Sequence, residues 1–217
     1  MHSEEQTVSR LLANCYPDYF TRSLKENRVC RLKIDPLTTE ACEAIVEEYQ
    51  NKLLPKSVEG KRNDVGHSGL DTHVTFTAYN KEFVNFIGTN EGKEFNLPDE
   101  VLNKLSFIED KDRAFWAVTA IRAGGYLLPH YDEKRQNLGK TTIVFPVIID
   151  PSHEYSPIEI YTDEKIFCTD KRIPCAVNIT KLHGVFNLTP NTRYNIHLRL
   201  RIPYTDFVQK YSEYVEW

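Results

Sequence analysis

Short runs of apolar residues, separated by turn residues, recur through the second half of the chain. β-Branched and aromatic side chains dominate these runs, which is typical of strands. They cover residues 114–122, 141–149, 158–161 and 176–180. Residues 28–34 alternate between apolar and polar positions in the same way, nearer the N-terminus. The pattern predicts a sheet structure built from several short strands.

Residues 193–202 show the clearest alternation. The apolar face of the expected strand carries Tyr194, Ile196, Leu198, Leu200 and Ile202, and the polar face carries Arg193, Asn195, His197, Arg199 and Arg201. A period of two places alternate residues on opposite faces of a strand. We expect the apolar face to pack under helices, Arg193 and Asn195 to face the interior of a barrel, and Arg201 to meet solvent.

One helix is predicted upstream of these strands. Thr38 or Thr39 can cap its N-terminus, and Pro55 would end it. Its expected apolar side consists of Ala41, Ala44, Ile45, Tyr49 and Leu53. Such a helix can buttress a sheet, so the whole pattern predicts a mainly-β fold with flanking helices.

Candidate chemistry lies in two histidines and one carboxylate. His130 and Asp132 stand two positions apart, and His183 follows about fifty residues later. Two imidazoles and a carboxylate suit a ferrous ion that must keep coordination positions open. Arg193 lies about ten residues beyond His183, and its guanidinium can hold a carboxylate with two parallel hydrogen bonds.

This spacing resembles that of the Fe(II)/2-oxoglutarate-dependent oxygenase superfamily. The segments PHYD at 129–132 and NITKLHGVFNLTPNTRYNIHL at 178–198 are most similar to the aspartyl/asparaginyl β-hydroxylase-like and amino-acid hydroxylase branch, and the match covers about residues 115–203. An Arg-x-His motif that many members of this branch carry after the first iron ligand is missing, since the corresponding segment reads KTTIVF at 140–145. This departure affects the choice of branch more than the choice of superfamily.

The resemblance implies a double-stranded β-helix core, of the jelly-roll or cupin-like kind. It implies that His130, Asp132 and His183 are the catalytic metal ligands for Fe(II), and that 2-oxoglutarate and O2 are cosubstrates. Arg193 would bind the C5 carboxylate of 2-oxoglutarate, with Asn195 as a helper. The implied reaction hydroxylates an amino acid or a peptidyl side chain and converts 2-oxoglutarate to succinate and CO2. Arg122, on the strand before His130, is a candidate for binding a substrate carboxylate.

Length and composition favour one domain. The chain has 217 residues, of which 41% are hydrophobic, enough to bury one good core. We expect a single oxygenase domain over 1–217, with an α/β support region over about 1–110 and the β-helix core over about 111–205. The net charge is −4 and basic residues are interspersed with acidic ones, which argues against a nucleic-acid partner.

Cysteine usage and the N-terminus predict an intracellular location. The five cysteines are odd in number and form no CxxC pair, so they indicate neither a disulfide scaffold nor a zinc site. The N-terminus is polar and acidic, and no stretch approaches 18 apolar residues. We therefore expect a soluble cytoplasmic protein without a membrane partner, acting on a small-molecule or peptidyl substrate.

Two alternatives stay open at this point. Arg193, Asn195 and Arg199 also resemble the R-x-N-x-x-x-R signature of nucleic-acid dealkylating oxygenases, in which both arginines bind 2-oxoglutarate. The other alternative is a non-enzymatic jelly-roll interaction module. The sequence leaves open the substrate, the oligomeric state and whether Arg199 shares in cosubstrate binding.

Overall fold

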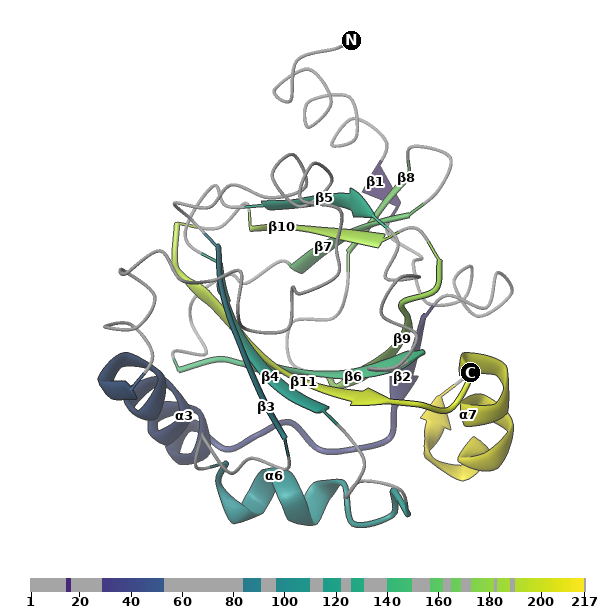
Figure 1. Ribbon diagram of the computed structural model, residues 1–217, viewed down its shortest axis with the longest axis horizontal. Helices are drawn as coiled ribbons and strands as arrows, with labels where there is room; N and C mark the ends of the chain where they lie inside the picture. Colours follow the sequence, from purple (N-terminus) through teal and green to yellow (C-terminus); the bar gives the residue numbers. More distant parts are fainter. Residues whose placement is uncertain are drawn as a thin grey trace, which may run out of the picture.

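The computed structural model describes a set of strands and helices with gaps between them. The described residues are 15–16, 29–52, 84–90, 97–109, 115–121, 126–130, 140–149, 157–161, 165–168, 173–181, 183–187 and 190–216. Within these residues the strands form two sheets, which face each other in Figure 1. This arrangement agrees with the predicted jelly-roll core.

The larger sheet, called the major sheet below, contains the strongly alternating strand that the sequence predicts. Its order is β12 (Val215–Glu216), β2 (Val29–Leu32), β9 (Cys175–Asn178), β6 (Thr141–Val147), β11 (Arg193–Leu200), β4 (Phe115–Ile121) and β3 (Val84–Asn90). All of its described pairs are antiparallel. The strands β12 and β2 therefore extend the sheet on one side of the central β9, β6, β11 and β4, and β3 extends it on the other.

The smaller sheet, called the minor sheet, carries the two predicted histidine ligands. Its order is β1 (Cys15–Tyr16), β8 (Lys165–Cys168), β7 (Pro157–Tyr161), β10 (His183–Asn187) and β5 (Tyr126–His130). The pairs are antiparallel except for β1 with β8, which is parallel. The chain thus passes repeatedly between the two sheets, from β4 to β5 to β6, then through β7 and β8 to β9, and from β9 to β10 to β11.

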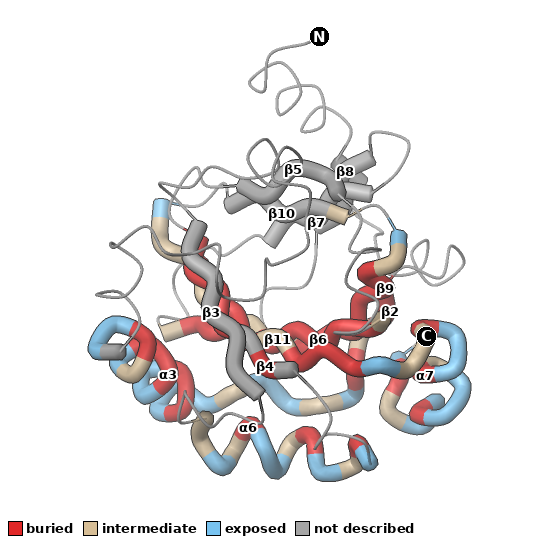
Figure 2. Tube along the Cα trace, in the orientation of Figure 1, coloured by how far each residue is buried: buried red, intermediate tan, exposed pale blue. Residues whose placement is uncertain are grey.

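Helices cover one face of the major sheet. They are α3 (Thr39–Lys52), α6 (Asp99–Lys104) and α7 (Tyr204–Lys210), followed by the 3₁₀ turn η4 (Ser212–Tyr214). Figure 1 shows them on the side away from the minor sheet. Figure 2 shows that the buried residues run along the major sheet and along the helix sides that meet it. Within the described residues, no helix has the length and apolar character that crossing a membrane requires.

The main hydrophobic core lies between the major sheet and these helices. Ile196, Leu198 and Leu200 of β11 pack there with residues of α3, α6 and α7 such as Ile45, Val101 and Phe207. The opposite face of the major sheet, called the inner face below, has a separate apolar cluster of Val29, Val144, Cys175, Val177 and Ile179. The predicted division of β11 into a helix-packed apolar face and a polar inner face is confirmed.

Helix α3 begins as the sequence predicts. Thr38 caps it, because its Oγ1 accepts a hydrogen bond from the backbone N–H of Ala41 at 3.3 Å. The buried side consists of Ala41, Cys42, Ile45, Val46 and Tyr49. The prediction that Ala44 belongs to this side is wrong, since Ala44 is exposed; the positions Cys42, Ile45, Val46 and Tyr49 fit the helical repeat of three and four residues better. Leu53 lies outside the described residues.

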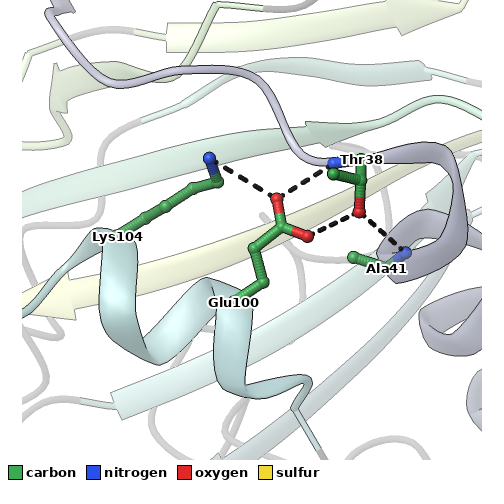
Figure 3. A network of polar contacts seen from close by, with 4 residues as sticks. All are labelled: Thr38, Ala41, Glu100 and Lys104. Carbon is green, nitrogen blue, oxygen red and sulfur yellow. Dashed lines mark hydrogen bonds and ion pairs between the residues drawn. The ribbon is translucent and has the colours of Figure 1, made fainter.

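Glu100 connects the start of α3 to α6 (Figure 3). Its carboxylate accepts a hydrogen bond from the backbone N–H of Thr38 at 3.0 Å and another from the Thr38 hydroxyl. Lys104, one turn further along α6, lies 3.4 Å from the same carboxylate. Partial burial raises the pKa of Glu100, but the Thr38 hydrogen bonds and the charge of Lys104 outweigh this and lower it below its ordinary value of 4.5. The ionised carboxylate therefore joins two of the helices that support the major sheet.

Three of the described cysteines are free thiols in the core. Cys30, Cys42 and Cys175 are buried, and none of them forms a disulfide. Burial raises the pKa of the Cys30 thiol, and a hydrogen bond with Tyr204 offsets part of this effect. The resulting pKa is about 11. This thiol stays protonated and acts as a small apolar residue in the core.

We predict that Glu100→Gln makes folding stability less dependent on pH in the acid range. A carboxyl group whose pKa is lowered by folding stabilises the folded state at neutral pH, and this contribution is lost as the pH falls through the folded-state pKa. Urea unfolding at pH 7 and at pH 3 should therefore show a smaller loss of stability for the variant than for the wild type. Glu43→Gln, on the exposed side of α3, is the matched control. Equal losses for Glu100→Gln and wild type would contradict the assignment.

Candidate functional site

The two predicted histidine ligands are neighbours in the minor sheet. In the antiparallel pairing of β10 with β5, the Cα atom of His183 lies opposite that of His130. Directly opposite residues share one face of a sheet, with their Cβ atoms about 4.5–5.5 Å apart. Two positions far apart in the sequence are therefore adjacent on one face of the minor sheet.

The strand pairing is irregular next to these histidines. His183 pairs with His130, but Val185 pairs with Leu127, so β5 uses one residue more than β10 over this interval. Pro129 lies within the interval, and proline has no N–H to donate to a strand ladder. Such irregularities bend a strand and change the direction of nearby side chains, and they are common beside active sites. The order of strands also places β5 at an end of the minor sheet.

One ring nitrogen of His183 has a defined hydrogen bond. Its Nδ1 lies 2.8 Å from the backbone oxygen of Lys181. A carbonyl oxygen only accepts, so Nδ1 carries the proton and the lone pair of the neutral imidazole is on Nε2. Metal-bound histidines almost always donate their other ring N–H in this way, which fixes the tautomer and the ring orientation. His183 therefore has the tautomer that a metal ligand needs.

Two predicted site residues cannot be placed. Asp132, the third predicted metal ligand, and Arg122, the candidate for substrate binding, both lie outside the described residues. Among the residues that are described, no group of three histidine, cysteine or carboxylate side chains could hold a metal ion. The roles of Asp132 and Arg122 stay predictions. The structure does place the two histidines, His130 and His183. His130 stands two residues before Asp132 in the sequence.

Arg193 and Asn195 lie side by side on the inner face of the major sheet. Only 5% of Arg193 and 2% of Asn195 is exposed. With the Asn195 amide oriented to satisfy both of its partners, its oxygen accepts from Arg193 Nε at 3.0 Å and its nitrogen donates to the Tyr194 carbonyl at 3.2 Å. A guanidinium held in this way has a fixed direction, as recognition of a carboxylate requires.

The structure adds Thr119 and His197 to this region. Thr119 Oγ1 of β4 lies 2.9 Å from His197 Nε2 of β11, and Thr119 is opposite Asn195 in the strand pairing. The alternation of residues 193–202 predicts His197 on the polar face but assigns it no role, and the sequence pattern does not single out Thr119. The signal that could have identified Thr119 is its polar side chain between the apolar Val118 and Ala120. Arg199, further along β11, is also buried, at 9% exposure, and pairs with Thr142 of β6.

Comparison with known proteins shows the fold. The chain has a jelly-roll of the double-stranded β-helix kind, with two opposed sheets. Its structure is similar to that of a prolyl-4-hydroxylase from Pseudomonas putida, with a TM-score of 0.51, 12% sequence identity, and coverage of 88% of this chain and 100% of the other. It is also similar to a prolyl hydroxylase from Trichoplax adhaerens in complex with a peptide fragment of the hypoxia inducible factor oxygen degradation domain, with a TM-score of 0.51, 12% identity, and coverage of 92% and 93%.

The sequence itself is distant from characterised groups. No family model matches it, and no curated protein matches it. The similarity to the two hydroxylases therefore rests on the course of the backbone. It confirms the predicted fold class, and both the oxygenase superfamily and the branch within it stay predictions.

We predict that Asn195→Leu destabilises the protein by about 1–3 kcal/mol, because it removes the acceptor to which the buried Arg193 Nε donates. The free energy of unfolding from urea titrations measures this effect. Asn103→Leu, the same substitution at an exposed position of α6, is the control and should change stability by less than about 0.5 kcal/mol. An Asn195→Leu variant as stable as the control would show that the hydrogen bond to Arg193 contributes little.

Proposed function

We propose that this protein is an Fe(II)/2-oxoglutarate-dependent dioxygenase that hydroxylates an amino acid or a peptidyl side chain. The pairing of His130 with His183 across β5 and β10 is the observation that carries the proposal. A metal site of this class needs two imidazoles on one side of a barrel wall, and the sequence motif supplies a carboxylate two residues after the first of them. The jelly-roll fold shared with two prolyl hydroxylases supports the same class.

The donor set fits a ferrous ion. His130, His183 and Asp132 would hold the metal, with His183 using Nε2 because its Nδ1 donates to the Lys181 carbonyl. Bound iron, together with 2-oxoglutarate and O2, supplies the oxidising power for hydroxylation, and 2-oxoglutarate becomes succinate and CO2. The contribution of the chain is to hold the reactants in position and to keep coordination positions open for them.

Arg193 would bind the C5 carboxylate of 2-oxoglutarate. Its guanidinium lies on the inner face of the major sheet, and this face is turned toward the minor sheet that carries the histidines (Figure 1). Burial lowers the local dielectric constant and so strengthens the attraction between a guanidinium and a carboxylate. Asn195 accepts a hydrogen bond from Arg193 Nε. This hydrogen bond would keep the two terminal NH2 groups of the guanidinium directed at the ligand.

The proposed substrate class rests on fold similarity and on the motif. The two similar structures described above are prolyl hydroxylases, and one of them is in complex with a peptide fragment. Arg122, close to the predicted metal motif, would bind a substrate carboxylate. A carboxylate partner of this kind suits a free amino acid or an acidic peptide.

A second candidate is a nucleic-acid dealkylating oxygenase. The burial of Arg199 on the same inner face as Arg193 favours it, because both arginines of that signature bind 2-oxoglutarate. The net charge of −4 gives little attraction for a phosphate backbone. Succinate formation with amino acids and peptides, compared with formation on alkylated single-stranded DNA, distinguishes the two candidates.

We predict that the protein binds one divalent metal ion through His130 and His183. Anaerobic titration with Co(II), a spectroscopic substitute for Fe(II), should give saturable visible absorption bands. His130→Ala and His183→Asn should each abolish them. Asparagine can still donate to the Lys181 carbonyl but has no atom at the Nε2 position, so His183→Asn should keep its thermal stability in the absence of metal. Unchanged Co(II) spectra in both variants would contradict the metal site.

We also predict that 2-oxoglutarate binding needs the metal and Arg193. Addition of 2-oxoglutarate to the anaerobic Fe(II) protein should produce the visible charge-transfer absorption of a chelate. Arg193→Ala should weaken binding by about a hundredfold or more, since a charge-assisted pair is lost, whereas Arg193→Lys should restore part of it. Arg201→Ala, at an exposed position, is the matched control.

Failure of these two experiments would support the remaining alternative. Folded wild-type protein that binds neither metal nor 2-oxoglutarate would be a non-enzymatic jelly-roll interaction module. Metal binding without 2-oxoglutarate binding would keep the histidine site and contradict the role of Arg193.

A further inference from the structure

The connection between β9 and β10 carries polar contacts that the proposed function does not yet use. The chain leaves the major sheet at Asn178, the last residue of β9, and enters the minor sheet at His183, the first residue of β10. Only residues 179–182 separate the two strands. Because the connection is this short, the conformation of the chain just after β9 affects how His183 is presented.

Asn178 holds a turn at the start of this connection. Its side-chain Oδ1 accepts hydrogen bonds from the backbone N–H of Thr180 at 3.1 Å and from the Thr180 hydroxyl at 2.6 Å. Its backbone oxygen accepts from the N–H of Lys181 at 3.2 Å. An asparagine whose side chain binds the backbone two residues further on favours a local turn. The side chain and the backbone of Asn178 therefore both fix the turn 178–181.

The turn starts from a fixed point in the major sheet. Asn178 is 7% exposed and pairs with Thr141 of β6. Ile179, the next residue, is buried in the apolar cluster of the inner face, and this burial stabilises its position by removing apolar surface from water. The major sheet thus determines where the turn lies.

The far end of the turn meets the predicted metal ligand. Lys181 is exposed, and its carbonyl oxygen lies 2.8 Å from His183 Nδ1. An exposed carbonyl can also hydrogen-bond to water, so it directs an imidazole well only when the backbone around it is fixed. The hydrogen bond from the Lys181 N–H to Asn178 fixes this backbone.

The contact with the Lys181 carbonyl selects one tautomer of His183. A neutral imidazole carries its proton on one of its two ring nitrogens, and the hydrogen bond of one nitrogen decides which. A carbonyl beside Nδ1 favours the tautomer with a free lone pair on Nε2, which is the form that binds a metal. Loss of this contact would leave the tautomer and the ring orientation unselected.

We propose that Asn178 is a positioning residue for the metal ligand His183. Its amide oxygen holds the turn 178–181 so that the Lys181 carbonyl meets Nδ1 and leaves Nε2 for the metal. The inference rests on the proposed function, since it deepens the site of His183. It gives a residue of the major sheet control over a ligand on the minor sheet.

The first test is anaerobic titration with Co(II), followed by its visible bands. Asn178→Ala removes the accepting oxygen, and we expect about tenfold weaker binding, as for other lost partners of metal-bound histidines. Thr141→Val is the matched control. It removes a buried hydroxyl that donates to the Ile202 carbonyl at 2.8 Å, at the position paired with Asn178, and leaves the turn intact. This control should lose stability but bind Co(II) as the wild type does.

The second test reads the tautomer of His183 without any metal. Long-range 1H–15N correlation spectra distinguish the two tautomers at a pH where the imidazoles are neutral, and the signals of His183 are those missing from His183→Asn. The wild type and Thr141→Val should show the proton on Nδ1. Asn178→Ala should show a second population with the proton on Nε2. Asn178→Asp keeps an accepting oxygen and should restore the wild-type tautomer.

Several outcomes would overturn this inference alone. They are unchanged Co(II) affinity in Asn178→Ala, equal weakening in Thr141→Val, or a wild-type tautomer of His183 in Asn178→Ala. If Asn178→Ala does not fold, Thr180→Val takes its place. This variant removes only the hydroxyl donor to Asn178, and Co(II) binding should weaken by about threefold. Wild-type protein that binds no Co(II) would overturn the proposed function and the inference with it.

Discussion

The two-sided packing of strand β11 is the constraint on which the rest of the structure depends. Ile196, Leu198 and Leu200 are buried in the core under the helices, and each contributes about 1.5–3 kcal/mol through the apolar surface it removes from water. A shift of one residue would turn these side chains inward and send the polar ones into the helix layer. Because the register is fixed in this way, Arg193, Asn195 and His197 must occupy the inner face.

The second requirement is that the two sheets bring distant segments together. The chain crosses repeatedly between the sheets, from β4 through β5 to β6, from β6 through β7 and β8 to β9, and from β9 through β10 to β11. The passages through β5 and β10 contribute His130 and His183, and β4 and β11 of the major sheet contribute the buried polar residues Thr119, Arg193 and Asn195. The proposed metal site and the proposed carboxylate site thus lie on opposite walls of one barrel, a suitable arrangement for a ligand that binds a metal at one end and a guanidinium at the other.

Contacts among the helices and the C-terminal segment support the major sheet from its outer side. Thr38, Glu100 and Lys104 connect α3 and α6, two of the helices that pack on the major sheet (Figure 3). Phe107, after α6, stacks on Tyr214 of the C-terminal segment, with ring centroids 3.9 Å apart. Sites built on supported strands hold their side chains more accurately than sites on loops. The helices therefore support the strands that carry the buried polar residues of the inner face.

The sequence by itself determined whatever depends on local periodicity. The alternation of residues 193–202 predicted both faces of β11, and Thr38 was one of the two expected caps of α3, because these features are set by neighbouring residues. Tertiary structure alone decided the pairing of His130 with His183, the register shift at Pro129, and the contact of Thr119 with His197. These depend on which strands become neighbours, and strand order is a property of the whole fold. The exposure of Ala44 shows the same limit on a smaller scale, since a helical repeat allows more than one apolar side and packing selects the one that is buried.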